Sequence, residues 1–260
     1  MPFKPPKAIV ETAISAGCTK AELPISKELI LGILAGAYIA IGGLLAIVVG
    51  RGSPAIAAAN PGLAKFIFGA VFPVGLMLVI IAGSELFTGN TGIITGSCLS
   101  KKAQWSGLAR NWGIVYIGNF VGSLIVALFL AYWSGIVKGG DLGTASAAIA
   151  EAKVAIPWFP ALLRGIGCNW LVCLAVWLAL SADDIAGKIL AIWFPIMAFV
   201  ALGFEHSVAN MFFIPLGMLN GANVSVGQFL WNNLIPVTIG NIIGGAGLVG
   251  GIYWWLYGRE

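Results

Sequence analysis

The single histidine of this sequence lies beside a glutamate inside a long apolar run. His206 follows Glu205 within residues 203–210 (GFEHSVAN), and apolar residues extend from about 189 to about 218. Ionisable groups in such surroundings are costly and usually mark a functional site or are satisfied by buried partners. Because an imidazole exchanges a proton near neutral pH, His206 is a candidate proton-handling residue on a permeation path. The alternative is a structural core histidine.

Metal, cofactor and enzyme chemistry find little support in the sequence. A metal ion needs several ligands, yet there is no second histidine and the cysteines show no CxxC spacing. An enzyme with His206 and Glu205 as an acid/base pair would also need a nucleophile, metal or cofactor motif, and none is visible. We therefore predict no metal, no cofactor and no enzymatic activity. The four cysteines are expected to be free thiols, and they are Cys18, Cys98, Cys168 and Cys173.

The composition predicts an integral membrane protein. Of the 260 residues, 59% are hydrophobic and 9% are charged, whereas a soluble domain carries roughly 25% charged residues. The first 26 residues contain several prolines and charges but no signal-peptide core, so we expect the N-terminus to stay in the cytoplasm. The net charge of +4 is small and gives no case for nucleic-acid binding.

Six membrane spans are expected, and the second and fifth are interrupted. The apolar run at about 63–99 is too long for one span of roughly 20 residues, and polar residues break it at 83–90 (GSELFTGN). The fifth run, 189–219, is broken at 203–210. The other spans are predicted at about 29–50, 111–134, 159–180 and 228–256, with a polar connection of roughly 25 residues before the fourth.

The positive-inside rule favours cytoplasmic N- and C-termini, with nine basic residues on their side of the bilayer and five on the other. We expect a cytoplasmic arm at 1–27, with a short amphipathic helix at 8–16 on the membrane surface, followed by a channel domain at 28–258. The cytoplasmic set is Lys4, Lys7, Lys20, Lys27, Lys101, Lys102, Arg110, Lys188 and Arg259, and the outer set is Arg51, Lys65, Lys138, Lys153 and Arg164.

The two halves, about 28–135 and 159–257, resemble each other. Phe72-Pro73 recurs as Phe194-Pro195, and the Gly-x-Glu that ends with Glu85 recurs as the one that ends with Glu205. Since each half has three spans, the second copy enters the membrane inverted, as in transporters whose site lies where two broken helices meet. The later matches are Asn90 with Asn210, Asn111 with Asn233, and residues 117–119 (IGN) with 239–241 (IGN).

Several polar residues are candidates for the path or for its scaffold. We expect Glu85 and Glu205 to accept hydrogen bonds from backbone amides freed at the breaks, with substrate or proton handling as the alternative. Asn169 could face the path, whereas Asn119 and Asn241 are expected to bridge helices. Lys153, in the outer connection, is either a solvated lysine or a residue that concentrates small anions.

Three segments together resemble the signatures of the formate/nitrite transporter family. They are residues 82–89 (AGSELFTG), 165–175 (GIGCNWLVCLA) and 203–211 (GFEHSVANM), and the resemblance extends from Lys27 to Tyr257. Residues 72–78, 167–175 and 193–200 are most similar to formate transporters. The resemblance implies an all-α, aquaporin-like membrane protein that forms a homopentamer in the cell membrane, with one pore for small monovalent anions in each protomer.

The resemblance also implies roles for individual residues. His206 would be the central pore histidine, Asn169 its polar neighbour, Thr88 the hydroxyl near it, and Lys153 the outer basic residue. The arm would correspond to a segment linked to pH gating in some members. The apolar constrictions would be formed by Phe72, Leu76, Leu86, Phe87, Val172 and Phe199. Independently of the resemblance, the internal repeat leads us to expect Asn90 and Asn210 to form the scaffold of the breaks with Glu85 and Glu205.

The predicted function is passage of formate, passive or coupled to protons through His206. Nitrite and hydrosulfide are alternatives because their charge and size are similar. A water or glycerol channel is a more distant alternative, since neither break contains the Asn-Pro-Ala typical of aquaporins. A bare anion is costly to dehydrate in an apolar slit, whereas neutral formic acid is not. We therefore expect a proton to be given to the anion near His206.

Overall fold

The computed structural model describes residues 3–52 and 54–259, and within them the chain is helical apart from turns and one isolated bridge between Phe3 and Ala182. Six helical segments are long and apolar enough to cross a membrane. This confirms the predicted all-α fold with six spans. The segments are Ile25–Arg51, Pro61–Gly83, Trp105–Trp133, Trp158–Ser181, Ile185–Leu202 and Val226–Gly258.

Some of these spans combine α-helical and π-helical pieces. The first span is α2 (Ile25–Arg51), and the second joins α4 (Pro61–Val71), α5 (Val74–Met77) and the π-helical η1 (Leu78–Gly83). The third joins α7 (Trp105–Ile125) and η2 (Val126–Trp133), and the fourth and fifth are α9 (Trp158–Ser181) and α10 (Ile185–Leu202). The sixth comprises α12 (Val226–Gln228), η3 (Phe229–Leu234), α13 (Ile235–Ile242), η4 (Ile243–Gly251) and η5 (Trp254–Gly258).

Both predicted breaks are confirmed. The backbone leaves the helical form at residues 84–86 and again at 204–206, and a shorter helix follows each break. These half-helices are α6 (Phe87–Leu99) and α11 (Ser207–Leu219). Gly83 and Gly203 end the preceding helices with φ values of 87° and 73°, a left-handed conformation that glycine adopts without a steric penalty. Pro195 lies inside α10, so the glycine rather than the proline stops the fifth helix.

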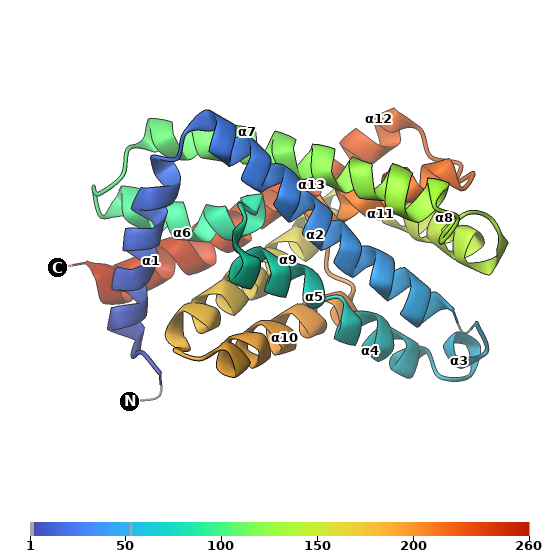
Figure 1. Ribbon diagram of the computed structural model, residues 1–260, viewed down its shortest axis with the longest axis horizontal. Helices are drawn as coiled ribbons and strands as arrows, with labels where there is room; N and C mark the ends of the chain where they lie inside the picture. Colours follow the sequence, from blue (N-terminus) through green and yellow to red (C-terminus); the bar gives the residue numbers. More distant parts are fainter. Residues whose placement is uncertain (1–2, 53, 260) are drawn as a thin grey trace.

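The connection between the third and fourth spans contains a helix that the sequence reasoning missed. It is α8 (Gly140–Val154), which packs against α11 in the way that α1 (Pro6–Ala21) packs against α6. In Figure 1, α1 lies at the left end of the molecule together with both chain termini, and α8 lies at the right end. The expectation that the termini share one side is therefore met. The short helix α3 (Pro54–Ala59) joins α2 to α4.

The N-terminal helix is longer than expected, and its apolar face does not face lipid. Ile9, Val10 and Ile14 are buried, and α1 contacts both α6 and α9. The expected position on the membrane surface is therefore corrected: the apolar stripe of α1 covers the half-helix of the first break. Burial against protein satisfies this stripe as fully as lipid would.

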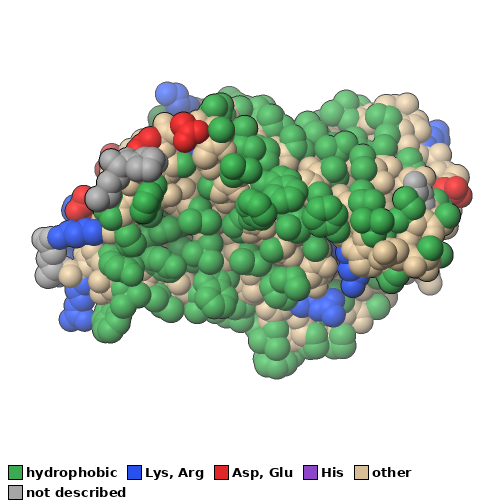
Figure 2. All heavy atoms as spheres, turned by 90° about the horizontal axis from the view of Figure 1, so that it is seen from below, with side chains coloured by type: hydrophobic (Ala, Val, Ile, Leu, Met, Phe, Trp, Pro, Cys, Tyr) green, Lys and Arg blue, Asp and Glu red, His purple; other side chains and the backbone are tan. Residues whose placement is uncertain are grey.

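The exterior of the molecule is largely apolar between its two ends. Figure 2 shows hydrophobic side chains over most of one face, with Lys and Arg side chains towards the left end and in a hollow at the right. Large exposed apolar residues such as Phe129, Phe159 and Leu202 suit contact with lipid or with another membrane segment.

Candidate functional site

The two half-helices begin side by side in the centre of the fold. The hydroxyl Oγ1 of Thr88, in the first turn of α6, lies 2.9 Å from Nε2 of His206, the residue that precedes α11. Both side chains are buried. The two breaks, far apart in the sequence, thus bring together the hydroxyl and the imidazole that the family resemblance singles out.

The imidazole also caps its own half-helix. Nδ1 of His206 accepts a hydrogen bond of 3.0 Å from the backbone N–H of Ala209. A ring nitrogen that accepts a hydrogen bond carries no proton, so the proton of the neutral ring is on Nε2 and is directed at Thr88. A second proton on the ring requires the bond to Ala209 to open first. The ring also lies 5.9 Å from the Phe199 ring, in a stacked arrangement.

Two asparagines hold the half-helices in place by equivalent contacts. The amide of Asn119 donates to the carbonyls of Gly32 and Glu85 at 2.8 and 2.9 Å, while its oxygen accepts from the Phe87 N–H at 2.9 Å. Two of these groups, the Glu85 carbonyl and the Phe87 N–H, would otherwise be orphaned by the break, and the bond to Gly32 ties them to α2. The prediction that Asn119 bridges helices is confirmed.

Asn241 makes the same three bonds in the second half. It donates to the carbonyls of Gly165 and Glu205 at 2.8 and 3.0 Å and accepts from the Ser207 N–H at 2.9 Å. The two halves of the inverted repeat thus stabilise their breaks with the same three hydrogen bonds.

Each break also contains a buried carboxylate paired with a lysine, and Glu205 binds two asparagines directly whereas Glu85 binds one. Glu205 accepts from Lys153 Nζ at 2.9 Å and from the amides of Asn210 and Asn233 at 2.7 and 3.1 Å. Asn233 also donates to the backbone carbonyl of Lys153 at 3.1 Å. The pair is therefore built into the protein and differs from a solvated surface ion pair.

The first half repeats this arrangement with Lys20 from α1. Lys20 Nζ lies 2.6 Å from Glu85, whose other oxygen accepts from Asn90 at 2.7 Å. Asn111 donates to the carbonyl of Lys20 at 3.3 Å. The sequence reasoning missed Lys20, because the repeat was traced only from residue 28 onward and α8 was not recognised as the counterpart of α1.

The carboxylates do not bind the backbone amides that we expected. The freed amides of Phe87, Ser207 and Ala209 are instead taken by Asn119, Asn241 and His206. The carboxylates of Glu85 and Glu205 receive ammonium and side-chain amide donors. The cause is the packing of distant helices. Asn119 on α7 and Asn241 on α13 lie against the breaks, and their side-chain oxygens accept from the freed amides.

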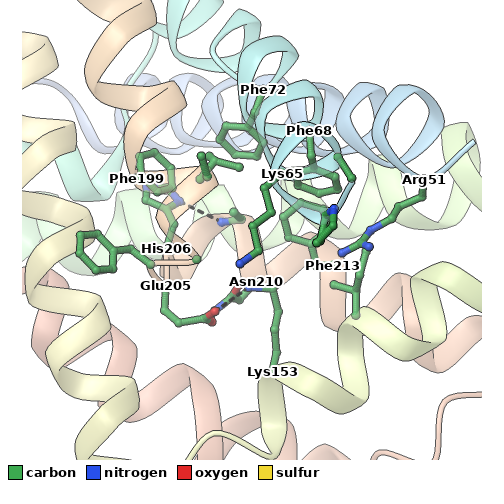
Figure 3. Close-up of a pocket in the computed structure, with 18 of the residues that line it drawn as sticks. Arg51, Lys65, Phe68, Phe72, Lys153, Phe199, Glu205, His206, Asn210 and Phe213 are labelled. Carbon is green, nitrogen blue, oxygen red and sulfur yellow. Dashed lines mark hydrogen bonds and ion pairs between the residues drawn. The ribbon is translucent and has the colours of Figure 1, made fainter. Parts of the chain in front are cut away.

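Two cavities approach the centre from the two ends of the molecule. The α8-side cavity, of about 270 Å³, is lined by His206, Phe72, Phe199, Lys153 and Glu205 among others. The α1-side cavity, of about 550 Å³, is lined by Lys20, Glu85, Leu76, Leu86 and Gly89 among others. They share no lining residue, and Thr88 lies between Gly89 of one and His206 of the other. Figure 3 shows His206 and Phe199 at the inner end of the α8-side cavity and Arg51 at the other.

The residues expected at the apolar constrictions are all buried, but they occupy different places. Phe72 and Phe199 face the α8-side cavity with ring centroids 5.9 Å apart, whereas Leu76 and Leu86 face the α1-side cavity. The remaining two constriction residues line neither cavity; these are Phe87 and Val172. The Phe87 ring packs 4.8 Å from that of Tyr116.

Asn169 lies directly behind the Thr88–His206 contact. Its amide donates to the Thr88 carbonyl at 3.1 Å, to Thr91 Oγ1 at 2.9 Å and to the Asn241 carbonyl at 2.6 Å. It is fully buried and lines neither cavity. Asn169 thus positions the first turn of α6, which carries Thr88.

Removal of one partner of the Lys153–Glu205 pair should cost stability that removal of both partly restores. In Lys153→Met, the carboxylate of Glu205 stays buried without its ammonium, which we expect to cost about 2–4 kcal/mol of unfolding free energy. The double variant with Glu205→Gln should unfold at a higher temperature than Lys153→Met alone, because no uncompensated charge remains. Thermal unfolding in detergent measures this, and simple additivity of the two single effects would contradict the coupling.

Comparison with known proteins places this geometry in a family. The family model described as "Formate/nitrite transporter" matches residues 7–255. The chain belongs to the formate/nitrite transporter family. The prediction from the three motifs is thereby confirmed, as is the prediction that the protein is a transporter and not an enzyme.

Two relatives named for formate transport match over nearly their full length. A "Probable formate transporter" of Methanothermobacter thermautotrophicus is 52% identical, with 99% of this chain and 98% of that protein covered. The "Formate channel BtFdhC" of Bacillus thuringiensis is 42% identical, with 100% and 98% covered.

Solved structures show the same fold. An "FNT family ion channel" superposes with a TM-score of 0.87 at 32% identity, with 96% of this chain and 98% of that chain covered. A "Pentameric formate channel with formate bound" gives 0.78 at 36% identity, with 90% and 98% covered. The chain is thus a multi-pass membrane protein of the formate/nitrite transporter fold.

Proposed function

We propose that this protein passes formate across the cell membrane, and that formate crosses between the α8-side and α1-side cavities. The observation that carries the proposal is the Thr88–His206 contact of 2.9 Å, which lies between two cavities that open towards opposite ends of the molecule. The relatives named as formate transporters and channels support the choice of formate. The protein would act as a homopentamer, and the similarity to a solved pentameric formate channel supports that assembly.

The proposed orientation places both termini in the cytoplasm. The excess of basic residues on the side of the termini supports it, because such residues are retained on the cytoplasmic side. The α1-side cavity then opens to the cytoplasm and the α8-side cavity to the outside. Lys20 and Lys153 stand at equivalent points of the two entrances.

The proposed mechanism neutralises the anion at the centre. Formate that passes Phe72 and Phe199 loses water in an apolar surrounding, where the charged form is much less stable than formic acid. The bond between His206 Nδ1 and Ala209 opens and Nδ1 takes a proton from cavity water. The imidazolium then gives its Nε2 proton to a carboxylate oxygen, and Thr88 orients the two groups. Nδ1 afterwards returns its proton to cavity water and Nε2 takes one up, which restores the resting ring with Nδ1 bonded to the Ala209 N–H. Formic acid crosses Leu76 and Leu86 and ionises again in the opposite cavity.

A stopped-flow light-scattering assay on proteoliposomes tests the proposed function. Vesicles that contain the protein are mixed separately with sodium formate, nitrite, hydrosulfide and glycerol, and each swelling rate is compared with that of empty vesicles. We expect formate to give the fastest rate and to accelerate as the pH falls. Faster nitrite or hydrosulfide entry would transfer the function to that anion, and glycerol entry alone would overturn anion transport.

A further inference from the structure

The lysine at the α8-side entrance is electrically balanced. Lys153 Nζ lies 2.9 Å from Glu205, and their side chains are only 17% and 5% exposed. Because opposite charges at this distance largely cancel outside the pair, Lys153 contributes little net field to an anion in the cavity. A different source of positive charge is needed if the entrance is to attract anions.

Two further cations line the same cavity. Arg51, at the end of α2, and Lys65, on α4, are exposed, and neither forms an ion pair with an acidic residue of the described chain. The Arg51 guanidinium lies 5.7 Å from the centre of the Phe68 ring, which fixes it at the cavity wall. In Figure 3 the Lys65 side chain lies between His206 and Arg51, and Arg51 lies at the end of the cavity away from His206.

An adjoining hollow increases the positive charge on this side. It measures about 350 Å³, shares Arg51, Lys153 and Glu205 with the α8-side cavity, and adds Arg164. The acidic residues of α8 do not offset these cations at the cavity wall. Asp141 and Glu151 line neither hollow, and the Glu151 carboxylate accepts from the Asn223 N–H at 2.9 Å.

The α1-side cavity lacks such an excess. Its charged lining residues are Lys20 and Glu85, which are 2.6 Å apart, and their formal charges sum to zero. In the α8-side cavity the residues Arg51, Lys65 and Lys153 stand against Glu205 alone, three positive charges against one negative, a formal sum of +2. The two cavities of the inverted repeat therefore have matching lysine–glutamate pairs but linings of different formal charge. A hollow lined by Lys101, Lys102, Arg110 and Glu22 also lies near α1, but it shares no lining residue with the α1-side cavity.

We propose that Arg51 and Lys65 form an anion-collecting site at the α8-side entrance, distinct from the balanced Lys153–Glu205 pair. Unpaired cations at the mouth of a cleft raise the local concentration of small anions such as formate. The site gives the transporter a lower half-saturation constant for anions from the α8 side than from the α1 side. For a passive path at zero membrane potential and equal pH, the permeability at low formate concentration must be equal in both directions. The asymmetry therefore shows in the half-saturation constants measured from the two sides and not in that permeability. This inference rests on the proposed function.

The experiment uses right-side-out and inside-out membrane vesicles that contain the full-length protein. The half-saturation constant for labelled formate is measured from each side, at low and at high NaCl, for wild type, Arg51→Gln, Lys65→Gln and the double variant. A unit charge about 7 Å from the anion in water changes its local concentration about threefold. We therefore expect the constant on the α8 side to rise about threefold for each single variant and about fivefold to tenfold for the double variant at low salt.

Salt and a matched lysine separate this site from a general surface effect. The wild-type constant on the α8 side should rise with NaCl because salt screens exposed charges, whereas the double variant should respond weakly. The constant on the α1 side should not change. Lys138→Gln removes an exposed lysine that lines neither cavity and packs on Tyr132, and it should behave as wild type.

Three outcomes would overturn the collecting site: an unchanged constant in the double variant, an equal rise in Lys138→Gln, or equal constants on the two sides of the wild-type protein. Failure of the proposed function is recognised separately. If wild-type vesicles carry nitrite or hydrosulfide instead of formate, the same titration with that anion tests the site. If they carry glycerol alone, both proposals are overturned.

Discussion

Replacement of His206 by phenylalanine is expected to reduce formate uptake at pH 7 by roughly 10²-fold, the scale typical of a lost proton-transfer group, and to remove its rise towards low pH. Phenylalanine keeps an aromatic ring beside Phe199 but has no proton to give and no acceptor for the Ala209 N–H. The measurement is uptake into proteoliposomes across pH 5–8. A variant that retained the wild-type pH dependence would exclude the proposed relay.

The matched control for His206→Phe is His206→Asn. Asparagine is a favourable residue before a helix and can still accept from Ala209, but it does not titrate in this range. We expect His206→Asn to unfold at a temperature near that of wild type while it shares the transport defect of His206→Phe. If His206→Asn transported formate with the wild-type pH profile, the imidazole would act as a helix cap alone.

The charge state of His206 can also be followed directly. Because the chain contains a single histidine, ring ¹⁵N labelling reports on this residue without overlap. The hydrogen bond from Ala209 leads us to expect an unprotonated Nδ1 and a protonated Nε2 in the resting protein at neutral pH. A resting imidazolium with both nitrogens protonated would contradict the starting state of the proposed mechanism.

Asn241→Leu is expected to be the most destabilising of these substitutions. It leaves the Glu205 carbonyl and the Ser207 N–H at the break buried without their partner, whereas the Gly165 carbonyl keeps its helical bond within α9. Unsatisfied buried groups cost about 1–3 kcal/mol each, so for two groups we expect a loss of roughly 2–6 kcal/mol and a melting temperature lowered by roughly 10 °C or more. Formate uptake should be lost as well, since the start of α11 carries His206.

The control variants are chosen from equivalent and neighbouring positions. Asn119→Leu removes the corresponding three bonds in the first half and should have a similar effect. Asn232→Leu lies nearby but removes one weak bond, of 3.4 Å, to the Val154 carbonyl, and its effect should stay within about 1 kcal/mol. Thermal unfolding in detergent compares the variants, and equal melting temperatures for Asn241→Leu and Asn232→Leu would show that the asparagine bridge carries little stability.

The family resemblance left the partners of the buried carboxylates open. The expectation that Glu85 and Glu205 accept from backbone amides followed from local rules for helix starts. In the structure, the backbone amides at the starts of the half-helices donate to Asn119 and Asn241, which lie on other spans. The carboxylates of Glu85 and Glu205 form ion pairs with Lys20 and Lys153. Local rules cannot foresee this exchange, because the competing donors and acceptors are 32 or more residues apart in the sequence.

The sequence by itself determined the membrane class, the six spans, the two breaks and the family, because each follows from local composition or from a short motif. Low charge content excludes a soluble surface, runs of about 20 apolar residues set the spans, and glycines before polar residues mark the breaks. The tertiary structure decided the role of α1 and α8, the pairing of Lys20, and the proton position on His206. It also decided the unequal formal charge of the two cavity linings. These features depend on which distant side chains meet in three dimensions, and a periodic apolar pattern carries no information about that.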